Sequence, residues 1–419
     1  MKNVRGTRDI LPPESIIRKE IIDIIRRTYE EFGFLPMETP ALEKWEVLSK
    51  KGAGGSEVLE ESFKFKDRKG REIGLRYDMT VPLARFISEN RSIVLPFKRY
   101  QIDRVWRYGD VTRGRLREFW QADIDVIGSK EIEADAEVVS CAVVAMRRLG
   151  FRKFFVRINN RKVLNDIMNY AGVSESKRLD VIRTIDKLDK IGEKGVEEEL
   201  KKIIEIDVVK RLMKVLKISG KDVLKKVGTI IGNTEGLKEL KKLSEILNMI
   251  GISEYKIDLS LARGLDYYTG PIFEIFAEEG VGSVGGGGRY DNLIELFSGR
   301  KMPATGISLG IERIFEVLKD KFKVKDNIKV YVAIANEEVR VEGMKITLLL
   351  RENGVACDID LMKRKLNKQL EYAGKMKIPY VLIIGLNDLK KNIVTLRDMS
   401  SGKERKIRLD DVINELKKL

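Results

Sequence analysis

Four arginines lie within one short stretch of the chain, from Arg107 to Arg117. The residues on either side alternate in polarity and predict two strands joined by an arginine-rich loop. Guanidinium forks match phosphate oxygens, and an aromatic ring such as Phe119 can stack on a base. This spacing favours binding of a phosphorylated ligand. Arginine density alone also allows an exposed cationic hairpin that binds any polyanion.

The 419-residue sequence contains no histidine. Ser-His-Asp and Cys-His triads, a histidine general base and the usual catalytic zinc sites are therefore excluded. The two cysteines, Cys141 and Cys357, are too few for a disulfide framework or a zinc site, and they favour a reducing, cytoplasmic location. The groups that remain available for catalysis are carboxylates, arginines and backbone amides. They suit phosphoryl or adenylyl transfer, in which the substrates bring the nucleophile and the leaving group.

The net charge is +15, and the 59 residues from Leu361 onward hold 15 Lys or Arg against 7 Asp or Glu. This bias favours a polyanionic partner such as nucleic acid, although a lysine-rich solvated surface is the simpler alternative. No apolar run reaches the roughly 18 residues that a membrane span requires, and the N-terminal residues lack the apolar core of a secretory signal. We therefore expect no membrane association.

Residues Gly280 to Gly285 fit the pattern G-x-G-x-x-G and follow a predicted strand. Dinucleotide binding would also require a parallel βαβ unit and an acidic residue about 20 positions further on, and neither is clear here. We interpret the segment as a glycine-rich hairpin whose backbone a substrate can approach.

Hydrophobic periodicity predicts the elements that position these residues. Ile17, Ile21, Ile24 and Ile25 have helical spacing and predict a helix from Glu14 to Phe32. Short alternating segments such as Phe63 to Phe65 and Ile73 to Tyr77 predict strands of a mainly antiparallel sheet.

Composition then changes twice along the chain. Residues 174–254 are rich in Lys, Glu, Ile and Leu with helical periodicity, which predicts a helical insertion. It separates a first part, 1–173, from a second part, 255–320, which ends in a helix near Asp320. From Ile328 strands alternate with helices, which predicts a small C-terminal α/β domain, 328–419, with a parallel sheet core.

Five separated segments together resemble the class II aminoacyl-tRNA synthetases, and specifically the histidyl-tRNA synthetase family. Residues 97–128 are similar to motif 2, Ala304 to Arg313 to motif 3, and Pro40 to the motif 1 proline at the dimer interface. LARGLDYYTG from Leu261 and GGGRYD from Gly286 resemble signatures of the histidine enzymes. The resemblance covers nearly the whole chain. It implies an α+β catalytic domain with an antiparallel sheet, a helical insertion and a C-terminal anticodon-binding domain.

Two positions are informative about this resemblance. LRYDMT, from Leu75, resembles the archaeal and eukaryotic form of the amino-acid loop, because the common bacterial form has Glu at the position of Asp78. In motif 2, Gly109 stands where a Glu that contacts ATP is usual, and Asp110 is a candidate to replace it.

The resemblance also assigns roles. Histidine binding falls to Asp78, Thr80 and Gln121 for the α-ammonium, and to Asp125, Tyr267 and Tyr268 for the imidazole. The catalytic residues are Arg107 and Arg263, which flank the α-phosphate. ATP binding falls to these two arginines together with Arg115, Phe119 and Arg313. Mg²⁺ would arrive with ATP as co-substrate, with no dedicated protein ligands and no prosthetic group. Asp123 and Asp125 alternate along a strand, so they should share one face.

The implied activity is ligation of histidine to tRNA(His), by a homodimer, with AMP and pyrophosphate released. One rival is a synthetase-like regulatory subunit of ATP phosphoribosyltransferase, although such paralogues usually lack the terminal domain. The other is a nucleic-acid-binding protein with an inactive synthetase fold. We expect the insertion to hold the tRNA acceptor arm, so that deleting residues 174–254 would spare adenylate formation and weaken charging.

Overall fold

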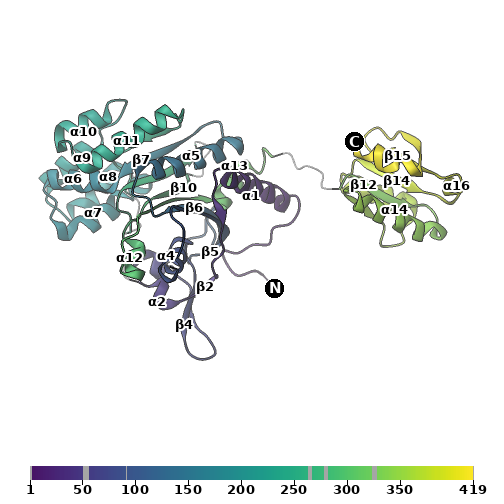
Figure 1. Ribbon diagram of the computed structural model, residues 1–419, viewed down its shortest axis with the longest axis horizontal. Helices are drawn as coiled ribbons and strands as arrows, with labels where there is room; N and C mark the ends of the chain where they lie inside the picture. The colour runs from purple at the N-terminus through teal and green to yellow at the C-terminus, as the bar shows by residue number, and fades with distance from the viewer. Residues whose placement is uncertain are drawn as a thin grey trace. The chain divides into compact units, whose positions relative to one another are not determined.

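The computed structural model describes residues 2–50, 56–90, 92–262, 267–277, 282–322 and 328–418. The chain forms two compact units, Met1–Phe322 and Lys323–Leu419 (Figure 1). The first contains the predicted catalytic part and insertion, and the second contains the predicted terminal domain.

An eight-stranded sheet forms the centre of the first unit, in the order β1-β5-β6-β11-β10-β9-β7-β8. The antiparallel pair of β5 (Phe97–Trp106) and β6 (Glu118–Ile127) confirms the two strands predicted around the arginine-rich loop. Only the edge pairs β1–β5 and β7–β8 are parallel within the described sheet. The other strands are β1 (Leu35–Pro36), β7 (Phe154–Asn160), β8 (Tyr255–Ile257), β9 (Pro271–Ala277), β10 (Ser283–Arg289) and β11 (Ala304–Gly310).

Alternation along β6 separates the hydrophobic core from the opposite face of the sheet. Ala122 and Ile124 are fully buried in the main hydrophobic cluster, and the Tyr29 hydroxyl donates to the Ala122 carbonyl at 3.0 Å. Tyr29 belongs to α1 (Glu14–Glu31), which matches the predicted helix. The helices α1, α5 (Ile132–Arg148) and α13 (Ile311–Leu318) pack on this side of the sheet. The odd-numbered residues of β6 therefore face away from these helices.

A second, three-stranded sheet has the order β2-β4-β3. Its antiparallel pair β3 (Lys64–Lys66) and β4 (Glu72–Leu75) confirms the short strands predicted here, with each strand shifted by one or two residues. The neighbouring elements are β2 (Leu42–Lys44), α2 (Trp45–Leu48), α3 (Ser56–Glu60), α4 (Thr80–Glu89) and α12 (Leu293–Ser298).

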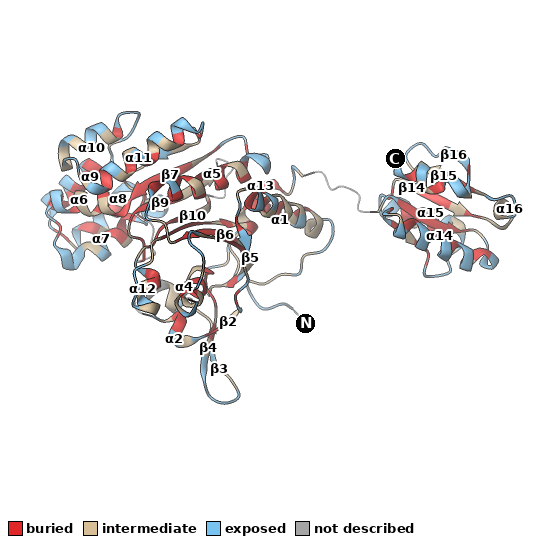
Figure 2. Ribbon diagram, viewed as in Figure 1, coloured by how far each residue is buried: buried red, intermediate tan, exposed pale blue. Residues whose placement is uncertain are grey.

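Helices fill the segment between β7 and β8, as predicted. Figure 2 shows buried positions on these helices as well as on the sheet. Hydrophobic residues of the helices, such as Leu212 and Leu243, belong to the same cluster as the sheet residues Val156 and Ile158. The segment therefore packs as part of the first unit, and its exact boundaries at 174 and 254 stay a prediction. None of the helices in the described ranges is long and apolar enough to cross a membrane. The helices are α6 (Arg161–Ala171), α7 (Arg178–Ile185), α8 (Leu188–Lys201), α9 (Ile206–Leu216), α10 (Val223–Ile231) and α11 (Glu235–Met249), with a short 3₁₀ turn at Glu175–Lys177.

The second unit contains a five-stranded sheet in the order β13-β12-β14-β15-β16. The three predicted strands are parallel: β12 (Val330–Ile334), β13 (Cys357–Ile359) and β14 (Tyr380–Ile384). The sheet is nevertheless mixed, because β15 and β16 continue it antiparallel and were not predicted. The two strands are β15 (Ile393–Asp398) and β16 (Glu404–Arg408), and the helices are α14 (Arg340–Glu352), α15 (Leu366–Lys375), α16 (Leu386–Leu389) and α17 (Val412–Lys417), with 3₁₀ turns at Glu337–Val339 and Leu409–Asp411.

Helices cover both faces of this sheet. Val332 of β12 belongs to the cluster that contains Leu350 of α14, whereas its neighbour Tyr331 belongs to the cluster that contains Ala373 of α15. Such alternation is expected for a parallel strand between two helical layers. The second unit therefore has a hydrophobic core of its own.

Candidate active site

A cavity of about 570 Å³ opens on the face of the large sheet opposite α1 and α5. Every predicted site residue in the described ranges lines this cavity: Asp78, Thr80, Arg107, Arg115, Phe119, Gln121, Asp125, Tyr267, Tyr268 and Arg313. Arg263 lies outside the described residues. Positions separated by more than 200 residues in sequence therefore meet at one site.

Asp125 lies buried at one end of the cavity, beside two residues that were not predicted as site residues. Its Oδ2 is 2.7 Å from Nη2 of Arg99, which is fully buried. Its other oxygen accepts a hydrogen bond from the hydroxyl of Tyr290. Burial raises the pKa of Asp125, while the Arg99 guanidinium and the Tyr290 hydroxyl lower it. Tyr290 lies within the GGGRYD segment, so the sequence contained a signal for it.

Gly306 of β11 leaves room for this carboxylate. A Cβ atom at residue 306 would lie 2.1 Å from Oδ1 of Asp125 and 2.6 Å from the carbonyl oxygen of Ile124. Only glycine therefore allows β11 to pair with β6 at this register. This accounts for the glycine in the motif 3 segment.

Four residues that line the cavity have a buried side-chain oxygen without a hydrogen-bond partner among the described residues: Oδ2 of Asp78, Oε1 of Gln121, Oδ1 of Asp123 and Oδ2 of Asp125, of which the last is ion-paired with Arg99. Asp78 uses Oδ1 to accept from the backbone N–H of Val81 at 3.0 Å, at the start of α4. Gln121 donates from Nε2 to Ser308 Oγ at 2.9 Å. Buried acceptors left in this state favour a ligand that donates hydrogen bonds, such as an ammonium group.

Burial raises the pKa of Asp78 to about 6, and the Val81 N–H and the Arg107 guanidinium oppose this shift. Asp123, on the same face of β6, has its pKa raised to about 7, again chiefly by burial. The prediction that Asp123 and Asp125 share a face is confirmed, because both line the cavity. Three buried carboxylates with raised pKa values mark this part of the cavity as a candidate functional site.

Three tyrosine rings form the wall beside these acids. Tyr267 and Tyr268 lie with ring centroids 4.9 Å apart, and Tyr267 lies 5.9 Å from Tyr290. All three rings are buried. The hydroxyl groups are the only polar atoms that these side chains add to the wall. The wall combines aromatic surface with hydroxyl groups, as a flat polar ring such as imidazole would require.

Arginines and Phe119 line another part of the cavity. Arg107 donates from Nε to the Tyr77 carbonyl at 2.9 Å, and its guanidinium lies 5.5 Å from the centroid of the Phe119 ring. Arg313 donates to the carbonyl of Ser283 in β10. The two guanidiniums are thus held by backbone carbonyls of other elements. An anionic ligand would meet them with little rearrangement.

The N-terminal segment RGTRD supports this arginine-rich part from outside. Gly6 accepts from the backbone N–H of Arg117 at 2.8 Å, and a Cβ at residue 6 would collide with the Arg117 side chain at 2.6 Å. Arg8 and Arg113 both pair with Glu316 of α13, at 3.6 and 3.2 Å. These contacts join the motif 2 loop to the motif 3 helix.

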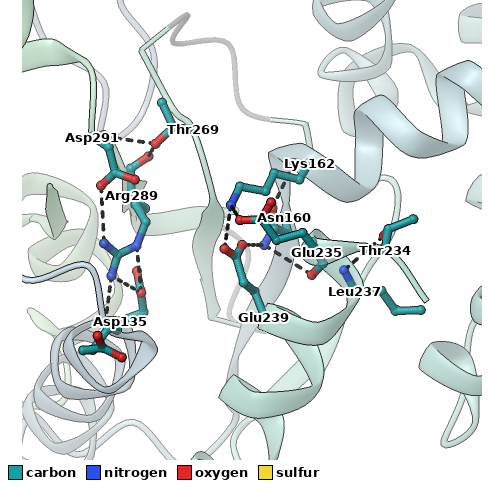
Figure 3. A network of polar contacts seen from close by, with 12 residues as sticks. Asp135, Asn160, Lys162, Thr234, Glu235, Leu237, Glu239, Thr269, Arg289 and Asp291 are labelled. Atoms are coloured by element: carbon teal, nitrogen blue, oxygen red, sulfur yellow. Dashed lines mark hydrogen bonds and ion pairs between the residues drawn. The ribbon is translucent and has the colours of Figure 1, made fainter. Parts of the chain in front are cut away.

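Arg289, at the end of the glycine-rich strand β10, is another buried support (Figure 3). It donates from Nε to Asp135 of α5 at 3.0 Å and from Nη1 to the Ser129 carbonyl at 2.9 Å. β10 also pairs antiparallel with β9, which excludes the βαβ unit of a dinucleotide fold and agrees with the hairpin interpretation. Gly280 and Val281 lie outside the described residues.

The helical segment contributes a wall that the sequence did not predict. Residues 185–190 line the cavity together with Arg157 of β7. Arg157 pairs with Asp189 at 2.6 Å and with Asp258 at 2.7 Å, which joins the first turn of α8 to the sheet. The spacing of residues in the sequence did not predict this contact, because the contact depends on how the helices pack against the sheet.

The antiparallel sheet, the two arginine-bearing motifs and the cavity between them define the catalytic domain of a class II aminoacyl-tRNA synthetase. The family model for histidyl-tRNA synthetase matches residues 6–314, and that for the anticodon binding domain matches residues 329–419. The chain belongs to the histidyl-tRNA synthetase family.

Relatives and solved structures agree with this assignment. The histidine–tRNA ligase of Thermococcus kodakarensis is 38% identical, over 99% of this chain and 98% of the relative. The crystal structure of histidyl-tRNA synthetase from Nostoc sp. PCC 7120 aligns with a TM-score of 0.85 and 32% identity, over 100% of this chain and 99% of that one. An ATP phosphoribosyltransferase regulatory subunit/histidyl-tRNA synthetase from Bacillus halodurans C aligns with a TM-score of 0.76 and 27% identity, over 88% of this chain and 96% of that one.

Proposed function

We propose that this chain is a histidine–tRNA ligase that works in two steps. A carboxylate oxygen of histidine attacks the α-phosphorus of ATP, and the bond to the bridging oxygen breaks to release pyrophosphate. A terminal ribose hydroxyl of tRNA(His) then attacks the acyl carbon of histidyl-adenylate and releases AMP. The observation that carries the proposal is a single cavity lined by buried acids and tyrosines as well as by arginines.

The acidic part of the cavity suits both polar groups of histidine. Asp78, Thr80 and Gln121 would bind the α-ammonium, and the unpartnered oxygens of Asp78 and Gln121 support this role. Asp125, with Tyr267 and Tyr268, would bind the imidazole. A site built on paired polar groups rejects analogues that leave those groups unpaired, by more than apolar packing achieves.

The arginines suit the charge that develops on the α-phosphate. Arg107 and Arg263 would flank this phosphate, while Arg313 would bind the outer phosphates. Phe119 would stack on adenine, and Arg115 would contribute further positive charge. No side chain acts as a nucleophile in this scheme, so the absence of histidine from the chain removes nothing that it needs.

Mg²⁺ would arrive on the triphosphate of ATP and neutralise its charge. Within the described ranges no group of three or more Cys, Asp or Glu residues could hold a metal ion, so the triphosphate would supply most of its ligands. We assign Mg²⁺ no dedicated protein ligand.

The second unit would bind the anticodon of tRNA, and the match of residues 329–419 to an anticodon-binding family supports this role. We also propose a homodimer in which Pro40 lies at the interface. A cytoplasmic location is supported by Cys141 and Cys357, which are both free and buried.

Histidine-dependent exchange of pyrophosphate into ATP tests the first step, with the other 19 amino acids as controls. Charging of total tRNA, followed by identification of the acylated species, tests the second. A regulatory subunit would bind histidine without exchange. An inactive synthetase fold would bind tRNA with an affinity that Arg263→Ala leaves unchanged, and it would form no adenylate. The absence of histidine-dependent exchange in well-folded protein would therefore exclude the proposed activity.

A further inference from the structure

The carboxylate of Glu61 lies beside Gly109, within the reach of a glutamate side chain at that position. A Cβ atom at Gly109 would lie 2.9 Å from Oε1 of Glu61 and 3.2 Å from Oε2. Position 109 is the motif 2 position at which the class pattern has a glutamate that contacts ATP. The missing carboxylate is therefore matched by a carboxylate from a different segment of the chain.

Asp110, the neighbouring acid in the sequence, does not occupy this place. It is exposed and is not among the residues that line the cavity, whereas both Gly109 and Glu61 line it. Glu61 directly follows α3, 48 residues before Gly109. Inspection of the sequence positions next to Gly109 would therefore not identify Glu61 as the replacement.

Backbone contacts fix Glu61 beside the motif 2 strand. The N–H of Tyr108 donates to the Glu61 carbonyl at 2.6 Å, and the Tyr108 ring packs edge-on against Phe63 with centroids 5.7 Å apart. The carboxylate is 34% exposed and faces Nη2 of Arg115 at 3.6 Å. It is thus held in position but remains accessible from the cavity.

We propose that Glu61 binds the nucleotide in place of the motif 2 glutamate, by accepting a hydrogen bond from the exocyclic amine of adenine. This inference rests on the proposed use of ATP. Guanine has a carbonyl oxygen at the corresponding position, which a carboxylate repels. Glu61 therefore selects ATP over GTP as well as binding it.

The direct experiment compares ATP affinity in Glu61→Ala, Glu61→Gln and Asp110→Ala, by calorimetric titration of the whole protein with ATP and by the KM values in pyrophosphate exchange. Glu61→Ala should weaken ATP binding about tenfold and leave the KM for histidine within about twofold, because one charged hydrogen bond is removed. Asp110→Ala should change neither value. A wild-type ATP affinity in Glu61→Ala, or an effect confined to Asp110→Ala, would overturn the proposal.

A rescue variant separates this role from a structural one. Gly109→Glu alone should weaken ATP binding, because two carboxylates would crowd one place. In a Glu61→Ala background the same substitution should restore most of the missing affinity. Glu61 would instead act only through Arg115 if its effect disappeared in an Arg115→Ala background, and that result would also refute the proposal. ATP binding without histidine-dependent exchange in the unchanged protein would count against the proposed ligase alone.

Discussion

Arg99 and Asp125 form a buried ion pair at one end of the cavity, with Nη2 and Oδ2 2.7 Å apart. They are direct partners in the register of β5 and β6. Arg99 also donates to the Met79 carbonyl at 3.3 Å, one residue after Asp78. The pair therefore keeps a negative charge available to a ligand at a place that burial alone would neutralise.

We expect Arg99→Met to destabilise the fold by about 3–5 kcal/mol, because removing one member of a buried pair leaves an uncompensated charge. Urea unfolding measures this change. Arg104→Met is the matched control on the same strand, since Arg104 is half-exposed and only 3.7 Å from Glu118, and should cost about 0.5 kcal/mol or less. Adding Asp125→Asn to Arg99→Met should recover part of the stability. A double variant less stable than Arg99→Met would contradict the pairing argument.

Gly306→Ala should abolish histidine-dependent exchange, because its Cβ would enter the space of the Asp125 carboxylate at 2.1 Å. Gly310→Ala is the control in the same strand, where the nearest atom would be the Val284 carbonyl at 3.4 Å. It should keep most of the activity. Circular dichroism of both variants distinguishes a damaged site from an unfolded chain. Equal activities would show that β11 can shift at residue 306 to accommodate the added Cβ atom.

Asp78 predicts a limb in the pH profile of kcat/KM for histidine. Its pKa is about 6 in the folded protein, so the carboxylate that would bind the ammonium becomes protonated as the pH falls below this value. The imidazole of the substrate titrates near 6.5 and adds a second limb. Asp78→Asn should lower activity and remove the Asp78 limb, so that only the titrations of the substrate and of Asp123, whose pKa is about 7, remain. Profiles of identical slope would exclude Asp78 as the titrating group.

The same group predicts how stability varies with pH. Asp78 binds a proton more tightly in the folded state than in the unfolded state, where its pKa is near 3.8. Stability conferred by this proton is present at low pH and is lost as the pH rises from about 4 to 6, on the order of 3 kcal/mol in total. Asp78→Asn should therefore be more stable than the unchanged protein at pH 8 and not at pH 4. Thermal unfolding at both pH values measures this, and a constant difference would refute it.

Arg107→Ala should reduce the rate of adenylate formation by about 10²–10³, the usual cost of removing a donor aimed at developing charge. Arg113→Ala provides a control within the same arginine-rich segment, because Arg113 pairs with Glu316 and does not line the cavity. Single-turnover measurements isolate the chemical step. Similar rate reductions in the two variants would indicate that the segment acts through its overall charge.

Several elements and site residues could be predicted from the sequence alone. The β5–β6 pair and α1 could be predicted because alternation and helical periodicity are local signals. The cavity residues from Asp78 to Arg313 could be predicted because their segments resemble motifs of the histidyl-tRNA synthetase family. Arg99 and Glu61 could not be, because their roles depend on the cross-strand register and on a loop packing beside motif 2. The strand β16 was missed because it is a short polar strand at the sheet edge with weak hydrophobic alternation. β15 lies inside the sheet, and it was missed because its buried run is only three residues long.

If the helical insertion binds the tRNA acceptor arm, reversing charges on its surface should weaken tRNA binding. The same change should not affect the first step, in which the adenylate forms. Deletion of residues 174–254 is a poor test, because it would remove the Asp189 partner of Arg157 and expose hydrophobic residues shared with the sheet. Lys221 and Lys225 instead line a surface hollow beside α10 and are exposed. Reversing both charges should raise the KM for tRNA about tenfold and leave pyrophosphate exchange within about twofold.

The control for this charge reversal is the pair Lys201 and Lys202, which already form ion pairs with Glu198 and Glu199. Changing both to Glu alters the net charge equally but should affect the KM for tRNA much less. The slope of log affinity against log salt should decrease by roughly 1 for each tRNA phosphate that Lys221 and Lys225 no longer neutralise. If both double variants weakened charging equally, net charge rather than a bound acceptor arm would explain the effect, and the proposed role of this surface would be wrong.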